Sequence, residues 1–115
     1  MKISTLNNSG SYTIYLKGEL DASTSILVDR AIDKALKSNI SELWVNCEGL
    51  RYISSTGLGV FMSYVKILKE KHVVMKMCGL NARVQNVFTI LGLDQVIPVV
   101  PLLDETQNLK QSNVA

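Results

Sequence analysis

Residues 52–60 read Tyr-Ile-Ser-Ser-Thr-Gly-Leu-Gly-Val, so three consecutive hydroxyl residues stand immediately before an apolar helical repeat. The repeat predicts an amphipathic helix, because its apolar side chains recur every three or four residues: Leu58, Phe61, Met62, Val65 and Leu68. The hydroxyl groups then face the N–H groups of the first helical turn. Those N–H groups have no helical acceptors and, together with the helix dipole, favour negative charge at this end.

The N-terminal part of the chain has the pattern of a β-hairpin. Tyr12, Ile14 and Leu16 alternate with polar residues, which predicts a half-buried strand. Residues 7–10 are typical of a turn, so a hairpin with a first strand at residues 2–6 is expected.

A helix and a short strand are predicted between the hairpin and the hydroxyl segment. The helix starts near Ser23 or Thr24, either of which could be its N-cap. The short apolar run 43–45 predicts a buried strand that ends in a turn at residues 46–49. The expected apolar face of the helix consists of Ile26, Leu27, Ala31, Ile32, Ala35 and Leu36.

The segment after the central helix continues the alternation. Residues 73–78 predict a strand that ends at Gly79, and a third helix follows from Asn81. Gly92 is the expected left-handed residue that ends this helix. Its apolar face is predicted to contain Val84, Val87, Phe88 and Leu91.

The C-terminal region predicts one more strand near residues 96–100 and a weakly amphipathic helix across Leu102, Leu103 and Leu109. Strands that alternate with helices favour an α/β fold with right-handed crossovers. We therefore expect one α/β domain at residues 1–110, with a mixed sheet of four to five strands and helices mainly on one face. The polar residues 111–115 are expected to form a disordered tail.

Composition excludes several classes of function. The 12 basic and 10 acidic residues are scattered along the chain, so nucleic acid is not an expected partner. No apolar run is long enough to span a membrane and no secretory signal is apparent, so a cytoplasmic protein without a membrane partner is expected. Cys47 and Cys78 lack metal-ligand spacing and are expected to be buried, reduced and unbridged.

No catalytic constellation is apparent, and neither a metal site nor a cofactor is expected. His72 has no ligand partners at suitable spacing, and Met62, Met75 and Met77 are interpreted as core residues. The Gly-Leu-Gly run lacks the further residues of a dinucleotide or P-loop motif, which leaves a nucleotide-binding or hydrolytic enzyme as a remote hypothesis. On local features alone, the favoured interpretation is that Ser54 or Ser55 is an ordinary N-cap and that Gly57 and Gly59 let the helix pack closely against the sheet.

Three motifs in order resemble those of STAS-domain anti-sigma factor antagonists: residues 18–24 (Gly-Glu-Leu-Asp-Ala-Ser-Thr), residues 50–60, and residues 81–88 followed by Leu-Gly-Leu. The resemblance implies a protein that is not an enzyme and that binds a kinase-type anti-sigma factor. It also implies that the kinase phosphorylates Ser55 and so releases the domain, and that a phosphatase resets it. The implied partner-binding residues are Asp21, Ser23, Ser54, Ser55, Thr56, Gly57 and Gly59.

Two points in this resemblance leave alternatives open. Ser54 stands where most such antagonists have Asp, which is compatible with a divergent partner or with constitutive binding. Asp21 could act only as a negative charge near the start of a helix. The second hypothesis for function is therefore a non-switching STAS subunit of a transporter or signalling assembly.

Overall fold

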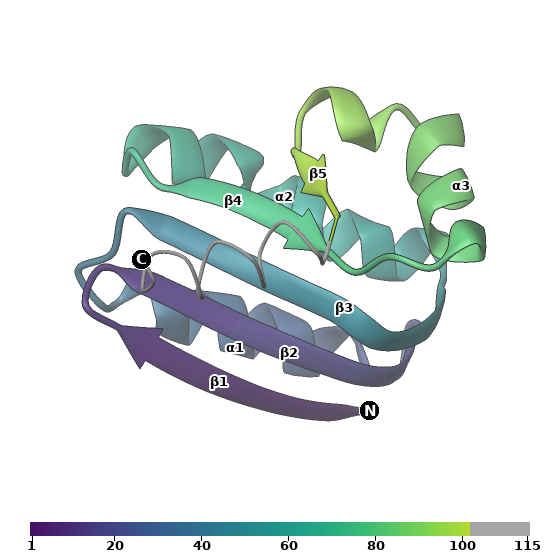
Figure 1. Cartoon of the computed structure of the whole chain (residues 1–115), viewed down its shortest axis with the longest axis horizontal. Coiled ribbons are helices and arrows are strands. Elements are labelled where there is room, and N and C mark those ends of the chain that lie inside the picture. The colour runs from purple at the N-terminus through teal and green to yellow at the C-terminus, as the bar shows by residue number, and fades with distance from the viewer. Residues whose placement is uncertain (102–115) are drawn as a thin grey trace.

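The computed structural model describes residues 1–101 (Figure 1). The expected helix across Leu102, Leu103 and Leu109 and the expected tail at 111–115 lie outside the described residues. The elements in chain order are β1 (Lys2–Asn8), β2 (Ser11–Leu20), α1 (Ser25–Leu36), β3 (Glu42–Ile53), α2 (Ser55–Glu70), β4 (Val74–Cys78), α3 (Ala82–Ile90), the 3-10 turn η1 (Leu93–Gln95) and β5 (Val99–Val100).

The strands form one mixed sheet in the order β1-β2-β3-β4-β5. β1 pairs antiparallel with β2, and every later pair is parallel. Each parallel connection passes through a helix, and α1 and α2 lie behind the sheet in Figure 1. The expected α/β class and the mixed sheet are confirmed.

The hairpin turn follows from two residues with positive φ, Ser9 at 45° and Gly10 at 97°. Two such residues form a type I′ turn, whose twist matches that of the flanking strands. The turn sets the register in which Asn8 lies opposite Ser11 and Lys2 opposite Lys17. The predicted hairpin is therefore confirmed, with a first strand two residues longer than expected.

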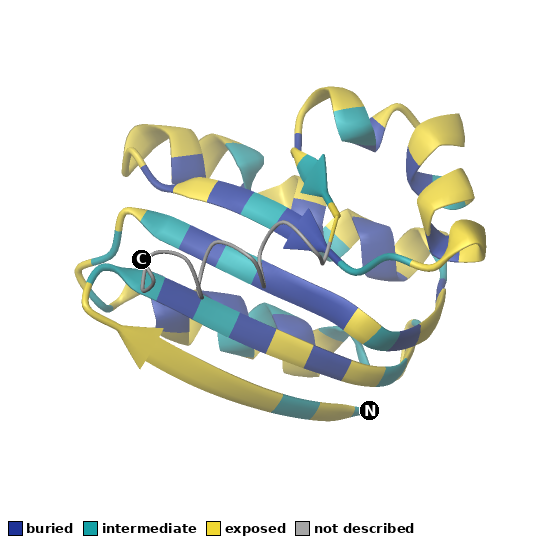
Figure 2. Cartoon of the chain, in the orientation of Figure 1, coloured by how far each residue is buried: buried dark blue, intermediate teal, exposed yellow. Residues whose placement is uncertain are grey.

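The core lies between the sheet and the helices, and β2 shows how the sequence pattern creates it. Tyr12, Ile14 and Leu16 are buried, whereas Tyr15 and Lys17 are exposed on the other face (Figure 2). Fully buried side chains of this size each contribute about 1.5–3 kcal/mol relative to an exposed position. Phe61 of α2 and Phe88 of α3 are the largest side chains that the helices bury completely here.

The buried faces of the helices differ from the predicted ones. In α1, Ile26 and Leu27 are 48% and 40% exposed, and the core face instead contains Val28. The helix begins only at Ser25, and Val28 lies four residues before the buried Ile32, on the same side of the helix. In α2, Tyr64 is buried and Met62 is 44% exposed, so the interpretation of Met62 as a core residue was wrong.

The strand β3 is a continuous strand of 12 residues, so the turn predicted at 46–49 was wrong. Two register shifts in the pairing of β2 with β3 accommodate residues 46–49 within the strand. The Asn46 side chain accepts a hydrogen bond from the Glu48 backbone, and a Cβ atom at Gly49 would lie 3.0 Å from the Leu16 carbonyl oxygen.

The last strand, β5, is shorter than predicted. β5 contains only Val99 and Val100, because residue 96 still belongs to the end of η1. Gly92 has φ 74°, which confirms the predicted left-handed residue after α3. Leu91 is 53% exposed and does not join the buried face of that helix.

Candidate functional site

The first turns of α1 and α2 meet at the end of the sheet formed by the C-terminal residues of β2 and β3. Leu20, the last residue of β2, lies beside Ile53, the last residue of β3. The Leu20 carbonyl also accepts a hydrogen bond of 2.9 Å from the Ser54 backbone N–H. The motifs at residues 18–24 and 50–60, far apart in sequence, are therefore adjacent in the structure.

The start of α2 is organised by Ser54. Its extended backbone (φ −93°, ψ 169°) ends the strand, and its Oγ accepts a 3.1 Å hydrogen bond from the Gly57 backbone N–H. Ser54 is therefore the N-cap. Ser55 is the first helical residue, and Ser55 and Thr56 are both exposed.

The two glycines of the segment have different roles. Gly57 is buried, and a Cβ atom there would lie 2.7 Å from Leu20 Cγ and 2.9 Å from the Leu20 carbonyl oxygen. Such distances are too short for a side chain, so Gly57 allows α2 to approach β2 closely. Gly59 is exposed, and no atom lies within 4 Å of the position of its missing Cβ.

The start of α1 is organised by Asp21. Its Oδ1 accepts hydrogen bonds from the Ser23 hydroxyl at 2.7 Å, from the Ser23 backbone at 3.0 Å and from the Thr24 backbone at 3.2 Å. These bonds, that from the Ser23 hydroxyl above all, lower the pKa of the carboxyl group. Asp21 therefore places a stable negative charge just before α1.

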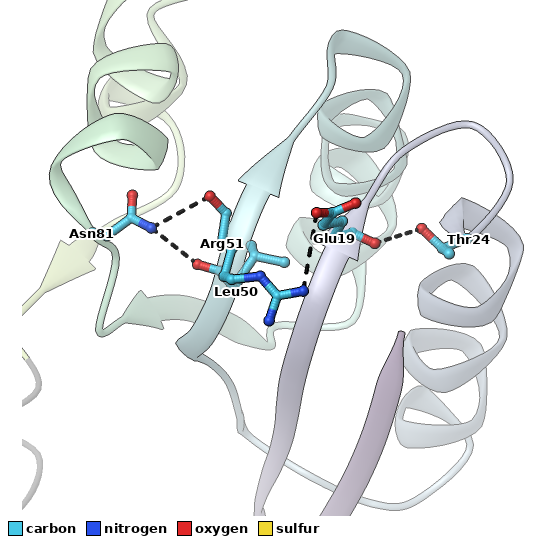
Figure 3. A network of polar contacts seen from close by, with 5 residues as sticks. All are labelled: Glu19, Thr24, Leu50, Arg51 and Asn81. Carbon is cyan, nitrogen blue, oxygen red and sulfur yellow. Dashed lines mark hydrogen bonds and ion pairs between the residues drawn. The ribbon is translucent and has the colours of Figure 1, made fainter.

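The expectation that Ser23 or Thr24 caps α1 with its hydroxyl was wrong. Thr24 is the N-cap residue by position, but its side chain accepts no hydrogen bond from the helix. The Thr24 hydroxyl instead donates to the Glu19 carbonyl at 2.9 Å (Figure 3).

A groove of about 340 Å³ lies between the first halves of α1 and α2, and its lining mixes small, polar and apolar side chains. Ile26 contributes the largest exposed apolar surface there. The sequence pattern did not reveal this residue as part of the site, because periodicity placed it in the core. The lining residues are Ser25, Ile26, Asp29, Thr56, Gly59, Val60 and Ser63.

Tyr64 links the two helices beneath this groove. Its hydroxyl group donates a 2.7 Å hydrogen bond to Asp29 Oδ1 on α1. Burial, and then the bond to Asp29, raise the pKa of Tyr64 far above its ordinary value. Tyr64 therefore stays a neutral donor and holds α1 at a fixed spacing from α2.

Asn81 joins α3 to the same end of β3, as Figure 3 shows. Its Nδ2 donates to the Leu50 carbonyl at 3.2 Å, and its Oδ1 caps α3 by accepting from the Val84 backbone at 2.8 Å. Arg51 and Glu19 form an ion pair at 3.9 Å across β3 and β2. Both side chains are exposed, so this pair contributes less than about 1 kcal/mol.

Two features of residues 1–101 concern other kinds of site. Within this range no helix is long and apolar enough to cross a membrane. Nor does this part of the chain contain a group of three or more His, Cys, Asp or Glu side chains placed to hold a metal ion. Cys47 and Cys78 are both buried and are not joined by a disulfide bond.

Comparisons with known proteins agree with this architecture. The STAS domain profile matches residues 2–106. The anti-sigma-B factor antagonist of Staphylococcus aureus is 27% identical over 99 residues, which cover 86% of this chain and 92% of the relative. The family resemblance predicted from the three motifs is confirmed.

Two solved structures have the same fold. An anti-sigma factor antagonist from Mycobacterium paratuberculosis superposes with a TM-score of 0.79 at 20% identity, covering 94% of this chain and 93% of the other. The anti-sigma factor antagonist SpoIIAA in its unphosphorylated form superposes with a TM-score of 0.77 at 18% identity, covering 99% and 98%.

Proposed function

Because this chain belongs to the STAS domain family, we propose that it is an anti-sigma factor antagonist whose binding is switched off by phosphorylation of Ser55. Relatives that match most of its length carry the antagonist name. In this proposal the unmodified domain binds a kinase-type anti-sigma factor, which releases a sigma factor. The protein acts by binding and catalyses no reaction.

The exposed position of Ser55 in the first turn of α2 is the observation that supports the switch. Ser54 already provides the cap, so a phosphoryl group on Ser55 leaves the capping hydrogen bond intact. A phosphoserine carries about −1.5 to −2 charges. The helix dipole favours a negative charge at this end by about 0.3–1 kcal/mol, so the folded state tolerates the modification.

Ser55 is a better phosphate acceptor than the two neighbouring hydroxyl residues. The Ser54 hydroxyl accepts a hydrogen bond from Gly57 and is only partly exposed, so phosphorylation there would break the cap. Thr56 is exposed, but it lines the groove between α1 and α2.

We propose that the partner covers Ser55 together with the groove beside it. The surface would contain Asp21, Ser23, Ser54, Thr56 and the exposed side chain of Ile26, with the exposed Gly59 as a position of close approach. Gly57 was also expected to bind the partner, but it is buried against Leu20 and can contribute only by positioning α2. A partner that covers phosphoserine without compensating cations would lose several kcal/mol to desolvation. Since about 1.4 kcal/mol corresponds to tenfold in affinity, that loss is enough to dissociate a micromolar complex. A phosphatase would restore binding.

The missing acidic residue at position 54 favours a second candidate function. Ser54 makes the capping hydrogen bond that an aspartate could also make, but it adds no negative charge beside Ser55. If kinase recognition needs that charge, the protein would instead be a constitutive STAS subunit of a transporter or signalling assembly.

One experiment separates the two candidates. The protein is incubated with ATP and the kinase-type anti-sigma factor of its own organism, and phosphate is located by mass spectrometry. We expect a single phosphate on Ser55 that is absent from Ser55→Ala and present in Thr56→Ala. A stable complex that forms without any phosphate transfer would replace the switch with the constitutive subunit.

A further inference from the structure

The β1 strand forms one edge of the sheet, and its outer side carries no strand among residues 1–101. Six of its seven residues are exposed, and only Ile3 is half-buried. Figure 2 shows this strand as an almost uninterrupted exposed band along the sheet. An edge strand presents unpaired backbone N–H and C=O groups that can template pairing with another strand.

The hairpin turn determines which backbone groups point outward. A two-residue turn is closed by a residue pair that exchanges both backbone hydrogen bonds, here Asn8 and Ser11. Hydrogen-bonded and non-bonded pairs then alternate along the antiparallel ladder. The N–H and C=O groups of Ile3, Thr5 and Asn7 therefore point away from β2.

β1 lacks the features with which natural proteins protect an edge. It contains no proline, its pairing with β2 has no register shift, and Lys2 is its one charged residue. The opposite edge is different, since β5 has only two residues and is followed by Pro101. Among residues 1–101, only β1 offers a long, regular edge.

We propose that β1 pairs antiparallel with the β1 strand of a second copy of this chain, about a twofold axis at Thr5. Thr5 is the midpoint of Lys2–Asn8, so this register pairs all seven residues. It places Ile3 opposite Asn7, and the cationic Lys2 opposite the uncharged Asn8, so no like charges face each other.

The side chains fit a second copy of the same strand. Leu6 is 53% exposed on the sheet face opposite the helices. In the proposed register the two copies of Leu6 are diagonal neighbours across the axis, within contact reach. The edge is therefore self-complementary in length, charge and apolar surface.

The proposed pairing leaves the Ser55 surface of each copy free and does not depend on the phosphorylation switch. The partner strand would lie on the outer side of β1, away from β3 and α2. Its end beside Lys2 would lie level with Lys17, three residues or about 10 Å along β2 from Leu20. An interface of one strand edge is small, so we expect a weak dimer that forms at high local concentration. Such a dimer would present two antagonist surfaces and could bind a dimeric partner with higher avidity.

Disulfide cross-linking tests the register. In the proposed dimer the two Thr5 Cα atoms are about 5.5 Å apart, which suits a disulfide bond. In Asn7→Cys the two new cysteines would be about 14 Å apart, because they lie four residues apart along the ladder and on different strands. With diamide as oxidant, Thr5→Cys should form covalent dimers at least about tenfold faster than Asn7→Cys. Equal rates, or faster dimerisation of Asn7→Cys, would overturn the proposed register.

Sedimentation equilibrium tests the dimer itself. Thr5→Lys places two ammonium groups opposite each other at the axis, whereas Asn86→Lys adds the same charge on an exposed position of α3. We expect the dimer dissociation constant to rise at least about tenfold in Thr5→Lys and to stay unchanged in Asn86→Lys. A wild-type protein that remains monomeric up to about 1 mM would refute the proposal.

Discussion

The helices α1 and α2 begin at the ends of two neighbouring parallel strands, and their first turns are built differently. Before α1, the carboxylate of Asp21 accepts hydrogen bonds from Ser23 and Thr24, so a negative charge is permanently in place. Before α2, the neutral hydroxyl of Ser54 provides the cap and Ser55 follows exposed. The N-termini of both helices favour negative charge. At α1 Asp21 supplies that charge, whereas at α2 the proposed phosphorylation of Ser55 would add it.

Among the substitutions that test this difference between α1 and α2, Gly57→Ala should have the largest effect, and it acts on the free energy of unfolding. The new methyl group would lie 2.7 Å from Leu20 Cγ, so α2 must move away from β2. We expect the free energy of unfolding to fall by about 2–3 kcal/mol. Urea denaturation measures the change, and Gly59→Ala is the matched control because no atom lies near its missing Cβ. Similar losses in both variants would contradict the close-approach role of Gly57.

Replacing Ser55 by Asp should impair binding while the fold survives. The carboxylate is favoured by the helix dipole but must be desolvated when a partner covers it. We expect at least about a tenfold loss of affinity for the anti-sigma factor, or about 1.4 kcal/mol, with an unchanged melting temperature. Ser55→Ala should bind normally and resist release by the kinase. Isothermal titration calorimetry that finds wild-type affinity for Ser55→Asp would rule out a charge-gated surface.

Replacing Ser54 by Ala should have a smaller effect on stability. The variant loses the capping hydrogen bond to Gly57 and should be destabilised by about 1 kcal/mol. Ser54→Asp restores an acceptor and should recover that stability while adding charge beside Ser55. Thermal unfolding of both variants, with Thr56→Ala as the control, would show whether Ser54 acts as the cap. Equal stability of Ser54→Ala and wild type would exclude that role.

The smallest expected effect concerns Asp21 and appears only in acid. Its pKa lies below the ordinary value of 3.8, so it binds its proton less readily in the folded than in the unfolded chain. Its contribution to stability is therefore present at neutral pH and is lost as pH falls through the lowered pKa. Ser23→Ala should raise the pKa of Asp21 towards 3.8, as measured by NMR titration. An unchanged pKa in this variant would show that the Ser23 hydroxyl is not its main cause.

The sequence was sufficient to predict the order of strands and helices, because the apolar residues of each element recur with the spacing of a strand or of a helix. It was insufficient where tertiary contacts override local preference. Asn46 and Gly49 are typical of a turn, yet strand pairing and a side-chain hydrogen bond hold both of them within β3. The helical spacing predicted Met62 in the core and did not indicate Tyr64. In the structure Tyr64 is buried and reaches Asp29 on α1, whereas Met62 is 44% exposed.

The candidate site was predictable in its residues but not in its construction. The hydroxyl segment identified the start of α2, and Ser54 is confirmed as one of the two expected caps. Gly57 contacts Leu20, which is distant in the sequence, so the residues around Gly57 do not predict this contact. Ile26 was predicted to lie in the core because its spacing from the other apolar residues of α1 fits a helix face. That spacing does not show whether the side chain is buried or exposed.

The hydrogen bond from Ser54 to the Leu20 carbonyl also has a consequence for the order of folding. The β1–β2 hairpin can form from neighbouring residues, whereas this bond requires that α1 and all of β3 have already returned to the edge of β2. Contacts between residues this far apart in sequence have a higher loop-closure cost than those of the hairpin, so we expect this bond to form after the hairpin. A chain that has not completed the β2–α1–β3 crossover lacks the Ser54–Leu20 junction, so only molecules that have completed it would present the proposed binding surface at Ser55.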